Sequence, residues 1–219
     1  MDFLNLLHKI FIADGGWLTS LNGLWVTIQI SALSILFGTI LGSFLCFLRT
    51  GNIKPLKIAA QVYIYIVRGS PVLMLLMLLF YGVLARQGLS PLFVAVVTFS
   101  MHTAAHVAEL LRSSLMALDK GQVEAARTLG FSKFQAFRLV TLPQLAKIAK
   151  PVYQSTIVNL IQWTSVVGYV TITDLTRVIN NIASRTMQPI ITITGGMLIY
   201  LALSYIIYAF FNLSNRERT

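Results

Sequence analysis

Three ionisable side chains stand at helical spacing near the middle of the sequence. His102, His106 and Glu109 follow one another at intervals of four and three residues, which brings them to the same face of an α-helix. Such a face can contribute ligands to Zn²⁺, but no second cluster of Cys, His or carboxylate residues supplies the rest of a zinc site. We therefore predict no metal site, and we expect two buried, neutral histidines that hydrogen-bond to neighbouring helices.

Glu109 gives the strongest indication of a function, because it follows a run without charged residues that begins at Gln87. An ionisable side chain inside a membrane span is costly and suggests a functional role by default. Two interpretations are open. Glu109, together with His106, lines the pathway of a polar or cationic substrate, or Glu109 forms a structural hydrogen bond or ion pair with Arg112, about one helical turn away.

Two hydroxyl groups occupy a later uncharged run. Thr164 and Ser165 lie within residues 151–173, which contain no Asp, Glu, Lys or Arg. Hydroxyl groups at such positions can bind a substrate, or they can donate to carbonyl groups of their own helix. The sequence favours neither role over the other.

Helices that cross a membrane must position these side chains. The 219 residues include 17 Lys and Arg and 7 Asp and Glu, and 56% are hydrophobic, whereas a soluble domain carries charge on about a quarter of its residues. This composition excludes a soluble domain and a disordered chain. Five long runs lack charged residues, and about 20 apolar residues suffice to cross a membrane. We predict an all-α integral membrane protein with five transmembrane helices, at about 22–48, 69–86, 90–113, 151–171 and 188–212.

The basic residues indicate how these helices are oriented. With the N-terminus outside and the C-terminus inside, 13 of the 17 Lys and Arg lie in the cytoplasm, and Lys9, Arg86, Arg177 and Arg185 lie outside. Cytoplasmic segments of membrane proteins carry such an excess. The net charge of +10 therefore reflects topology, and we predict no binding to nucleic acid.

Shorter segments flank the predicted spans. Residues 1–21 are expected to form an outer interfacial segment, and residues 213–219 a cytoplasmic tail. The outer segment 174–186 is expected to form a short surface helix. One face of this helix is apolar and consists of Leu175, Val178, Ile179 and Ile182.

Two further features concern the packing of the first spans. Gly38 and Gly42 form a GxxxG pair, which allows another helix to approach closely in lipid. Residues 58–67 are apolar but too few to cross a membrane, so we expect them at the cytoplasmic interface or as an extension of the second span. Arg68, close to Pro71, either anchors at lipid phosphates or marks a helix break.

The connection at 114–150 is longer than neighbouring helices need. Gly130 can end a helix in a left-handed conformation, and Leu142 with Pro143 is expected to end a following helix. Two helix starts are predicted from side-chain caps, Asp119 with Gln122 and Ser132 with Gln135. The segment therefore predicts two short, stiff helices that could insert into a groove of a partner protein. The alternative is an ordinary cytoplasmic hairpin.

Residues 121–144, GQVEAARTLGFSKFQAFRLVTLPQ, resemble the EAA loop of ABC importer permeases. Glu124, Ala125, Ala126, Gly130 and the Leu142–Pro143 pair stand at the spacing of that family. Three further segments resemble its polar amino acid branch: GLWVTIQIS around Thr27, VRGSPVLMLLMLLFYG, and HVAELLRSSL before the loop. The resemblance covers residues 20–212 approximately.

The resemblance implies a five-helix core that pairs with a second permease subunit, identical or homologous. Two ATPase subunits inside, a substrate-binding protein outside and the lipid of the bacterial inner membrane are the other implied partners. ATP and Mg²⁺ belong to the ATPase subunits, and this chain, which lacks a Walker phosphate loop, is expected to be neither an enzyme nor the holder of a cofactor. The implied ATPase-coupling residues are Gly121, Gln122, Glu124, Ala125, Ala126, Gly130, Leu142 and Pro143.

The chain departs from the family where a substrate would pass. The family usually has Lys, then Asp or Asn, then Thr-Ser in the fourth span, and this chain has Gln162, Trp163, Thr164 and Ser165. His106 stands where the family has Tyr. These changes leave the transported amino acid open, as well as the choice between homodimer and heterodimer. The candidate pathway residues are Glu109, His106, Gln162, Thr164 and Ser165. An ATP-independent facilitator or scaffold with the same core, and an exporter, are the alternatives.

Overall fold

The described part of the chain consists of helices joined by short connections. The structure, a computed structural model, describes residues 15–83 and 88–216, with side chains up to Asn212 in the last helix. Within these residues every element is helical, as the all-α prediction requires. The first half contains α2 (Gly16–Thr50), α3 (Lys54–Gly69), α4 (Val72–Met77), the π-helical η2 (Leu78–Val83) and α5 (Pro91–Met116). The second half contains α6 (Lys120–Thr128), α7 (Lys133–Ala136), the π-helical η4 (Phe137–Thr141), α8 (Leu142–Trp163), the 3₁₀ segment η5 (Thr164–Val170), α9 (Leu175–Thr186) and α10 (Pro189–Arg216).

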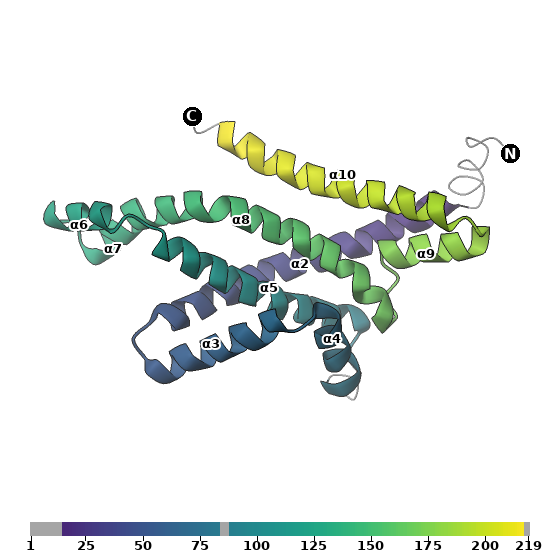
Figure 1. The fold of residues 1–219 in the computed structure, drawn as a ribbon, viewed down its shortest axis with the longest axis horizontal. Helices are drawn as coiled ribbons and strands as arrows, with labels where there is room; N and C mark the ends of the chain where they lie inside the picture. Colours follow the sequence, from purple (N-terminus) through teal and green to yellow (C-terminus); the bar gives the residue numbers. More distant parts are fainter. Residues whose placement is uncertain (1–14, 84–87, 217–219) are drawn as a thin grey trace.

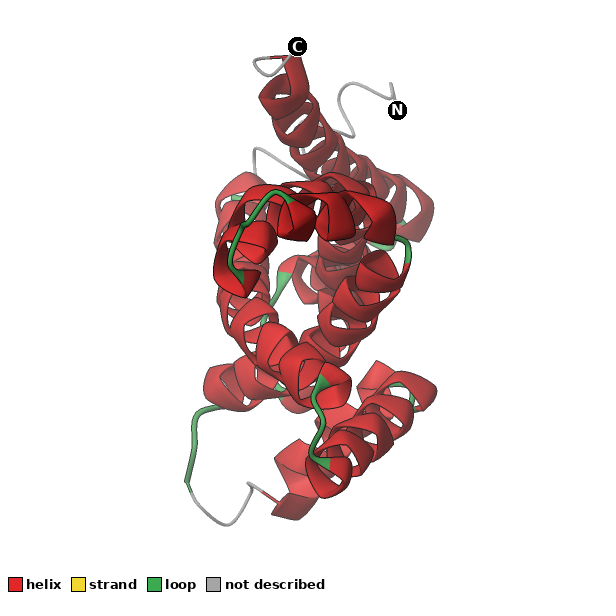
Figure 2. Cartoon of the chain, turned by 90° about the vertical axis from the view of Figure 1, so that its left-hand side faces the viewer, coloured by secondary structure: helices red, strands yellow, loops and turns green. Residues whose placement is uncertain are grey.

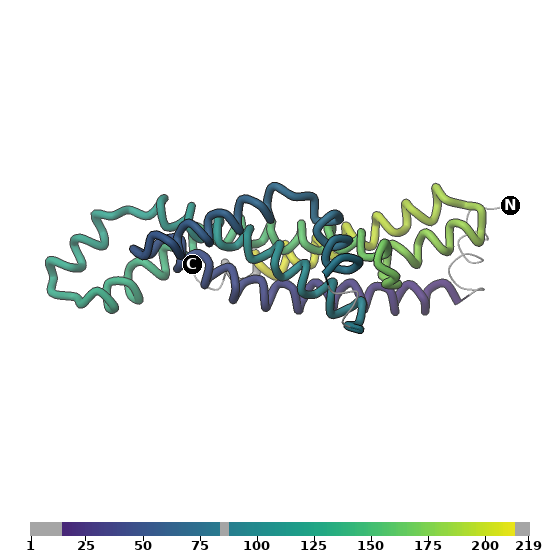
Figure 3. The backbone as a smooth tube through the Cα atoms, turned by 90° about the horizontal axis from the view of Figure 1, so that it is seen from below, coloured from purple at the N-terminus to yellow at the C-terminus, as the bar shows by residue number. Residues whose placement is uncertain are grey.

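The molecule is elongated, and its long helices follow the long axis (Figures 1 and 3). α2, α5, α8 and α10 have 35, 26, 22 and 28 residues. α6 and α7 lie at one end of the axis, and α9 lies at the other end beside the start of α2. Viewed from the α6–α7 end, α10 stands at the edge of the bundle (Figure 2). The fold thus separates the loop at 114–150 from the segment that contains α9.

Small residues bring α2 and α5 into the most extensive helix contact of the bundle. A Cβ added at Gly38 would lie 2.7 Å from Cβ of Thr103, and one added at Gly42 would lie 2.7 Å from the carbonyl oxygen of Ala104. Neither position has room for a side chain. The close helix approach predicted from the GxxxG pair is therefore confirmed.

The segment 58–67 does not continue as a straight helix into the second predicted span. α3 packs Ala60, Ile64 and Val67 into an apolar cluster with α2 and α5. The axis then bends by 108° before the segment 72–83. The bend lies at Ser70 and Pro71, because a residue before proline avoids the helical conformation and proline lacks the N–H that would continue the helix. Of the two roles proposed for Arg68, its position next to this bend agrees with a helix break.

The helix around Leu142 and Pro143 continues, contrary to the expectation that these residues end it. Residues 133–163 are helical throughout, with the wider turn η4 at 137–141. The Leu142 N–H bonds to the carbonyl of Phe137, five residues back. Pro143, which has no N–H to donate, directly follows this wider turn and lies inside the continuous helix 133–163. α8 accordingly begins nine residues before the predicted span at 151–171.

α9 forms where a short helix was predicted, and its apolar face is buried. Leu175, Val178, Ile179 and Ile182 are at most 6% exposed. Gly23 of α2 and Gly196 of α10 lie against this face, because an added Cβ would come within 3 Å of α9 atoms at either position. α9 is therefore a packed part of the bundle.

Three helices of the described chain are long and apolar enough to cross a membrane: Gly16–Thr50, Pro91–Met116 and Pro189–Asn212. The bent pair Lys54–Gly69 and Val72–Val83 makes a fourth candidate if it is one broken span. α8 is outside this group. Of the five predicted spans, composition and helix length together therefore support three to four.

Candidate functional site

The loop between α5 and α8 contains two helices with side-chain caps. The Gly121 N–H donates to Oδ1 of Asp119 over 2.9 Å at the start of α6. At the start of α7, the Gln135 N–H donates to Oγ of Ser132 over 3.2 Å, and the Ser132 N–H donates to Oε1 of Gln135 over 2.8 Å. Both predicted helix starts are confirmed, and the second is a complete capping box.

Gly130 ends the first of these helices in the predicted way. Its φ is +90°, and no atom lies within 4 Å of an added Cβ. A side chain would have room here, but a residue with a side chain is strained at positive φ. The backbone conformation therefore requires glycine. The Phe131 N–H bonds back to the carbonyl of Ala126, which closes the turn.

The outer surface of the loop is accessible, and large apolar side chains stand on it among charged and polar ones. Glu124 and Ala125 are exposed, whereas Ala126 is buried within the loop. Four large apolar side chains are also exposed, namely Leu129, Phe134, Phe137 and Leu139. Large exposed apolar groups at the end of an elongated molecule mark a surface for contact with another protein.

The loop is fastened to α8 by a hydrogen bond and by the helix itself. The Gln144 amide Nε2 donates to Oε1 of Gln122 over 2.9 Å. Gln122 therefore bonds to α8 rather than to the cap of its own helix. α7, η4 and α8 form one continuous helix from Lys133 to Trp163, so the loop and the middle of the bundle share a single element.

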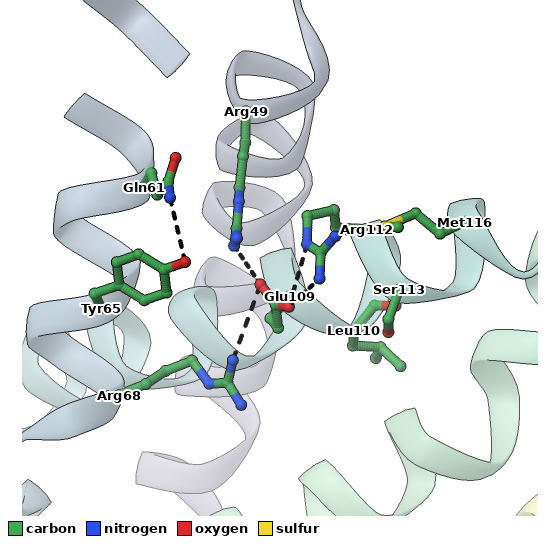
Figure 4. Close-up of polar contacts among 9 residues, drawn as sticks. All are labelled: Arg49, Gln61, Tyr65, Arg68, Glu109, Leu110, Arg112, Ser113 and Met116. Carbon is green, nitrogen blue, oxygen red and sulfur yellow. Dashed lines mark hydrogen bonds and ion pairs between the residues drawn. The ribbon is translucent and has the colours of Figure 1, made fainter. Parts of the chain in front are cut away.

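Glu109 lies among three guanidinium groups from three helices (Figure 4). Arg49 of α2 donates to Oε2, and Arg112 of α5 donates to Oε1 over 2.5 Å from Nη2 and 3.1 Å from Nε. Arg68 of α3 is 3.9 Å from Oε2. The predicted pairing with Arg112 is present, and Arg49 and Arg68 join it. This arrangement ties α2 and α3 to α5.

The two histidines contact an indole. The ring of His102 packs edge-on against Trp163, with 4.6 Å between centroids, and the ring of His106 lies 5.0 Å from the same indole. His102 is buried, and its Nδ1 has no hydrogen-bond partner among the described residues. The expected hydrogen bond from this atom to a neighbouring helix is therefore not formed, and aromatic packing replaces it.

The polar residues of the fourth predicted span divide between two environments. Thr164 is fully buried and donates to the Ile161 carbonyl over 2.7 Å, so its hydroxyl bonds its own helix. Gln162 is exposed and lines a groove of about 660 Å³ between α8, α9 and α10. Ser165 lines an adjoining pocket of about 370 Å³. Thr176 and Asn180 of α9 line both cavities.

The sequence pattern of the family described as "Binding-protein-dependent transport system inner membrane component" matches residues 34–218. The chain belongs to this family. The match includes the loop, the Glu109 cluster and both cavities. Family membership and the apolar helices together make the chain a multi-pass membrane permease component.

Individual members of the permease family agree with this assignment. The L-cystine transport system permease protein TcyL of Bacillus subtilis is 36% identical over 84% of this chain and 77% of the relative. The histidine/lysine/arginine/ornithine transport system permease protein HisM of Escherichia coli is 25% identical over 90% of this chain and 87% of the relative. A solved amino acid ABC transporter with histidines has a TM-score of 0.85 and 28% identity, and the match covers 99% of each chain.

Several contacts of the permease were not foreseen from its sequence. Arg49 and Arg68 are 60 and 41 positions from Glu109 in the chain, so no helical spacing connects them. Asp174 caps α9 by accepting from the Thr176 and Arg177 N–H groups over 3.1 Å each. An Asp directly before a periodic apolar run is a recognisable helix start, and this signal was available. Within the described residues, no group of three or more His, Cys, Asp or Glu could hold a metal ion.

Proposed function

We propose that this chain is the permease subunit of an ATP-driven ABC importer for polar amino acids in the bacterial inner membrane. The loop geometry carries the proposal. Two capped helices present exposed apolar groups at one end of the molecule, and one of them continues into α8. The transport systems to which TcyL and HisM belong support an amino acid as the substrate.

The proposed topology has five crossings, with the N-terminus outside and the C-terminus inside. α2, the bent segment 54–83, α5, α8 with η5, and α10 make these crossings. The loop then lies in the cytoplasm, where ATPase subunits are accessible, and α9 lies on the outer side, where a substrate-binding protein docks.

The proposed complex contains two permease subunits, identical or homologous, and two ATPase subunits. ATP and Mg²⁺ are bound by the ATPase subunits, and we assign no cofactor to the permease. ATP drives transport because the inward-facing and outward-facing states of the complex bind ATP with different affinities. In the coupling loop, Glu124 contacts the ATPase groove, Ala125 permits close approach, and Gly130 sets the turn between α6 and α7.

The proposed substrate pathway follows the groove between α8, α9 and α10. Gln162 and Ser165 are the predicted pathway residues that line its two cavities. Glu109, His106 and Thr164 have intramolecular contacts that account for their presence, so we assign them structural roles. Met197, Leu198 and Leu201 of α10 are exposed and line the same groove, so the second permease subunit is proposed to face the pathway on this side.

Variants of Gly130 test this function. Proline requires a φ near −65° and cannot adopt +90°, whereas asparagine tolerates the left-handed region. In vesicles containing the whole complex and its binding protein, Gly130→Pro should reduce substrate-stimulated ATP hydrolysis to the basal rate and stop uptake of labelled amino acids. Gly130→Asn should retain both activities, and Ala126→Glu should lose both.

Two results would contradict the proposal. Full coupling in the Gly130→Pro complex would show that the loop does not transmit the effect of ATP. Uptake that proceeds without ATP, with no ATPase subunit retained on gentle extraction, would favour the facilitator. A panel of competing amino acids in the same vesicles identifies the substrate.

A further inference from the structure

A basic pocket lies at the end of α2, next to the Glu109 cluster. Its volume is about 470 Å³. Arg49 of α2, Lys57 and Gln61 of α3, Arg112 of α5 and Lys120 at the start of α6 contribute to its lining. Four cationic side chains from four helices thus converge, and no carboxylate is among the described lining residues.

The positive charge of this pocket is only partly balanced. Glu109 supplies one carboxylate to Arg49 and Arg112, and Arg68 approaches the same carboxylate. Lys57 and Lys120 have no carboxylate within ion-pair distance among the described residues. A concave site with an excess of one charge concentrates ions of the opposite charge, so the pocket favours an anion.

The types of donor suit a phosphate group. A guanidinium offers paired N–H donors that match phosphate oxygens, and lysine adds a compact charge. Arg49 and Arg112 are already oriented by Glu109, with side chains 10% and 27% exposed. The Gln61 amide supplies a further neutral donor on the same wall.

Exposed apolar groups at the end of α2 favour a lipid as the source of that phosphate. Phe47, Ile53 and Met116 are 72%, 60% and 70% exposed. Met116 lines the pocket, whereas Phe47 lies in the last turn of α2 and Ile53 just after it, where the apolar helix ends and a membrane surface lies in the proposed topology. Acyl chains can cover such residues while a headgroup occupies the cationic pocket.

We propose that this pocket binds a phosphate-bearing anion, and that the headgroup of an anionic phospholipid is its source. This site goes beyond the transport function, and it depends on the membrane position of α2 but not on coupling to an ATPase. The bound headgroup would neutralise charge where α2, α3, α5 and α6 meet.

The experiment measures lipid binding to the purified transport complex by native mass spectrometry. The probes are phosphatidylglycerol, zwitterionic phosphatidylcholine and inorganic phosphate. The test variant is Lys57→Gln with Lys120→Gln, which leaves the Glu109 ion pairs intact. The control variant is Lys54→Gln with Lys133→Gln, since these exposed lysines of α3 and α7 lie outside the pocket.

The test variant should bind phosphatidylglycerol about 25-fold more weakly, because each basic residue at an anionic lipid surface contributes a factor of about five. The control should change less than about twofold. Equal loss in both variants, no loss in the test variant, or equally tight binding of phosphatidylcholine would each overturn the site. Binding of inorganic phosphate that requires Lys57 and Lys120, without binding of phosphatidylglycerol, would keep the phosphate site and overturn the lipid source.

Thermal unfolding of both variants verifies that they are folded. Lipid binding is measured without ATP or substrate, so a failure here is distinct from a failure of the coupling proposed for Gly130.

Discussion

At the scale of single residues, Glu109 contacts more helices than its predicted pairing with Arg112 would require. Its side chain is 19% exposed and accepts hydrogen bonds from Arg49 and Arg112, which lie on different helices. Removing one member of such a pair leaves a buried charge without compensation, which costs more than the pair itself contributes. This carboxylate therefore has a structural role that does not require a substrate.

Glu109→Gln should destabilise the permease by about 3 kcal/mol, because Arg49, 10% exposed, loses its carboxylate. Heat unfolding in detergent would measure the change. Glu124→Gln is the matched control, since Glu124 is exposed, and it should change stability by less than about 0.5 kcal/mol. A Glu109→Gln protein with unaltered stability and altered substrate selectivity would instead assign Glu109 to the pathway.

At the scale of elements, the sequence predicted those helix ends that depend on contacts between residues close together in the chain. The Ser132 capping box, the left-handed Gly130 and the apolar face of α9 each depend on residues within one or two turns. The π-helical turn before Pro143 was not predicted, because the local sequence does not distinguish a proline that ends a helix from one that follows a wider turn within a continuous helix. The direction of the chain after such a residue is decided by tertiary packing.

The cap of α9 gives a prediction at this scale. Burial raises the pKa of Asp174, while the hydrogen bonds that its carboxylate accepts from backbone N–H groups oppose this shift. Asp174→Asn keeps an acceptor and removes the cost of a buried charge, so the stability of α9 should change little. Asp174→Ala leaves two N–H groups without a partner and should cost on the order of 1–2 kcal/mol.

Hydrogen exchange of the α9 amides would measure this effect. Exchange should accelerate in Asp174→Ala and stay near that of the parent protein in Asp174→Asn. Asp119→Ala, which removes the exposed cap of α6, is the control, and it should affect α6 amides alone. Equal exchange of α9 in all three variants would show that the cap does not stabilise this helix.

At the scale of the whole molecule, composition predicted the class, and the GxxxG pair predicted a close helix contact, though not that α5 is the partner of α2. The convergence of Arg49, Arg68 and Arg112 could not be predicted, nor could the bond from the Leu175 N–H to Oγ1 of Thr27, 148 positions away. Such contacts depend on the angles between helices. The 108° bend after α3 is one of these angles, and Pro71 indicates its place but not its size.

The proposed topology makes a prediction for the intact cell. In a Cys46→Ser background, Ser184→Cys on α9 should react with a membrane-impermeant maleimide added outside spheroplasts, because this position is exposed. Lys133→Cys on the coupling loop should react after the membrane is permeabilised. The reverse pattern would invert the proposed orientation, and labelling of both positions from outside would refute it.

The continuous helix from the loop into the bundle has a mechanical consequence. α8 has 22 residues, which corresponds to about 33 Å at 1.5 Å per residue. Gln144, which bonds to the loop, lies near one end, and Trp163, which packs on His102 and His106, lies at the other. A tilt of about 5° would displace one end relative to the other by about 3 Å over this length. α8 is thus a lever long enough to turn a small rotation at the proposed ATPase-binding loop into a displacement as large as a methyl group beside the two histidines.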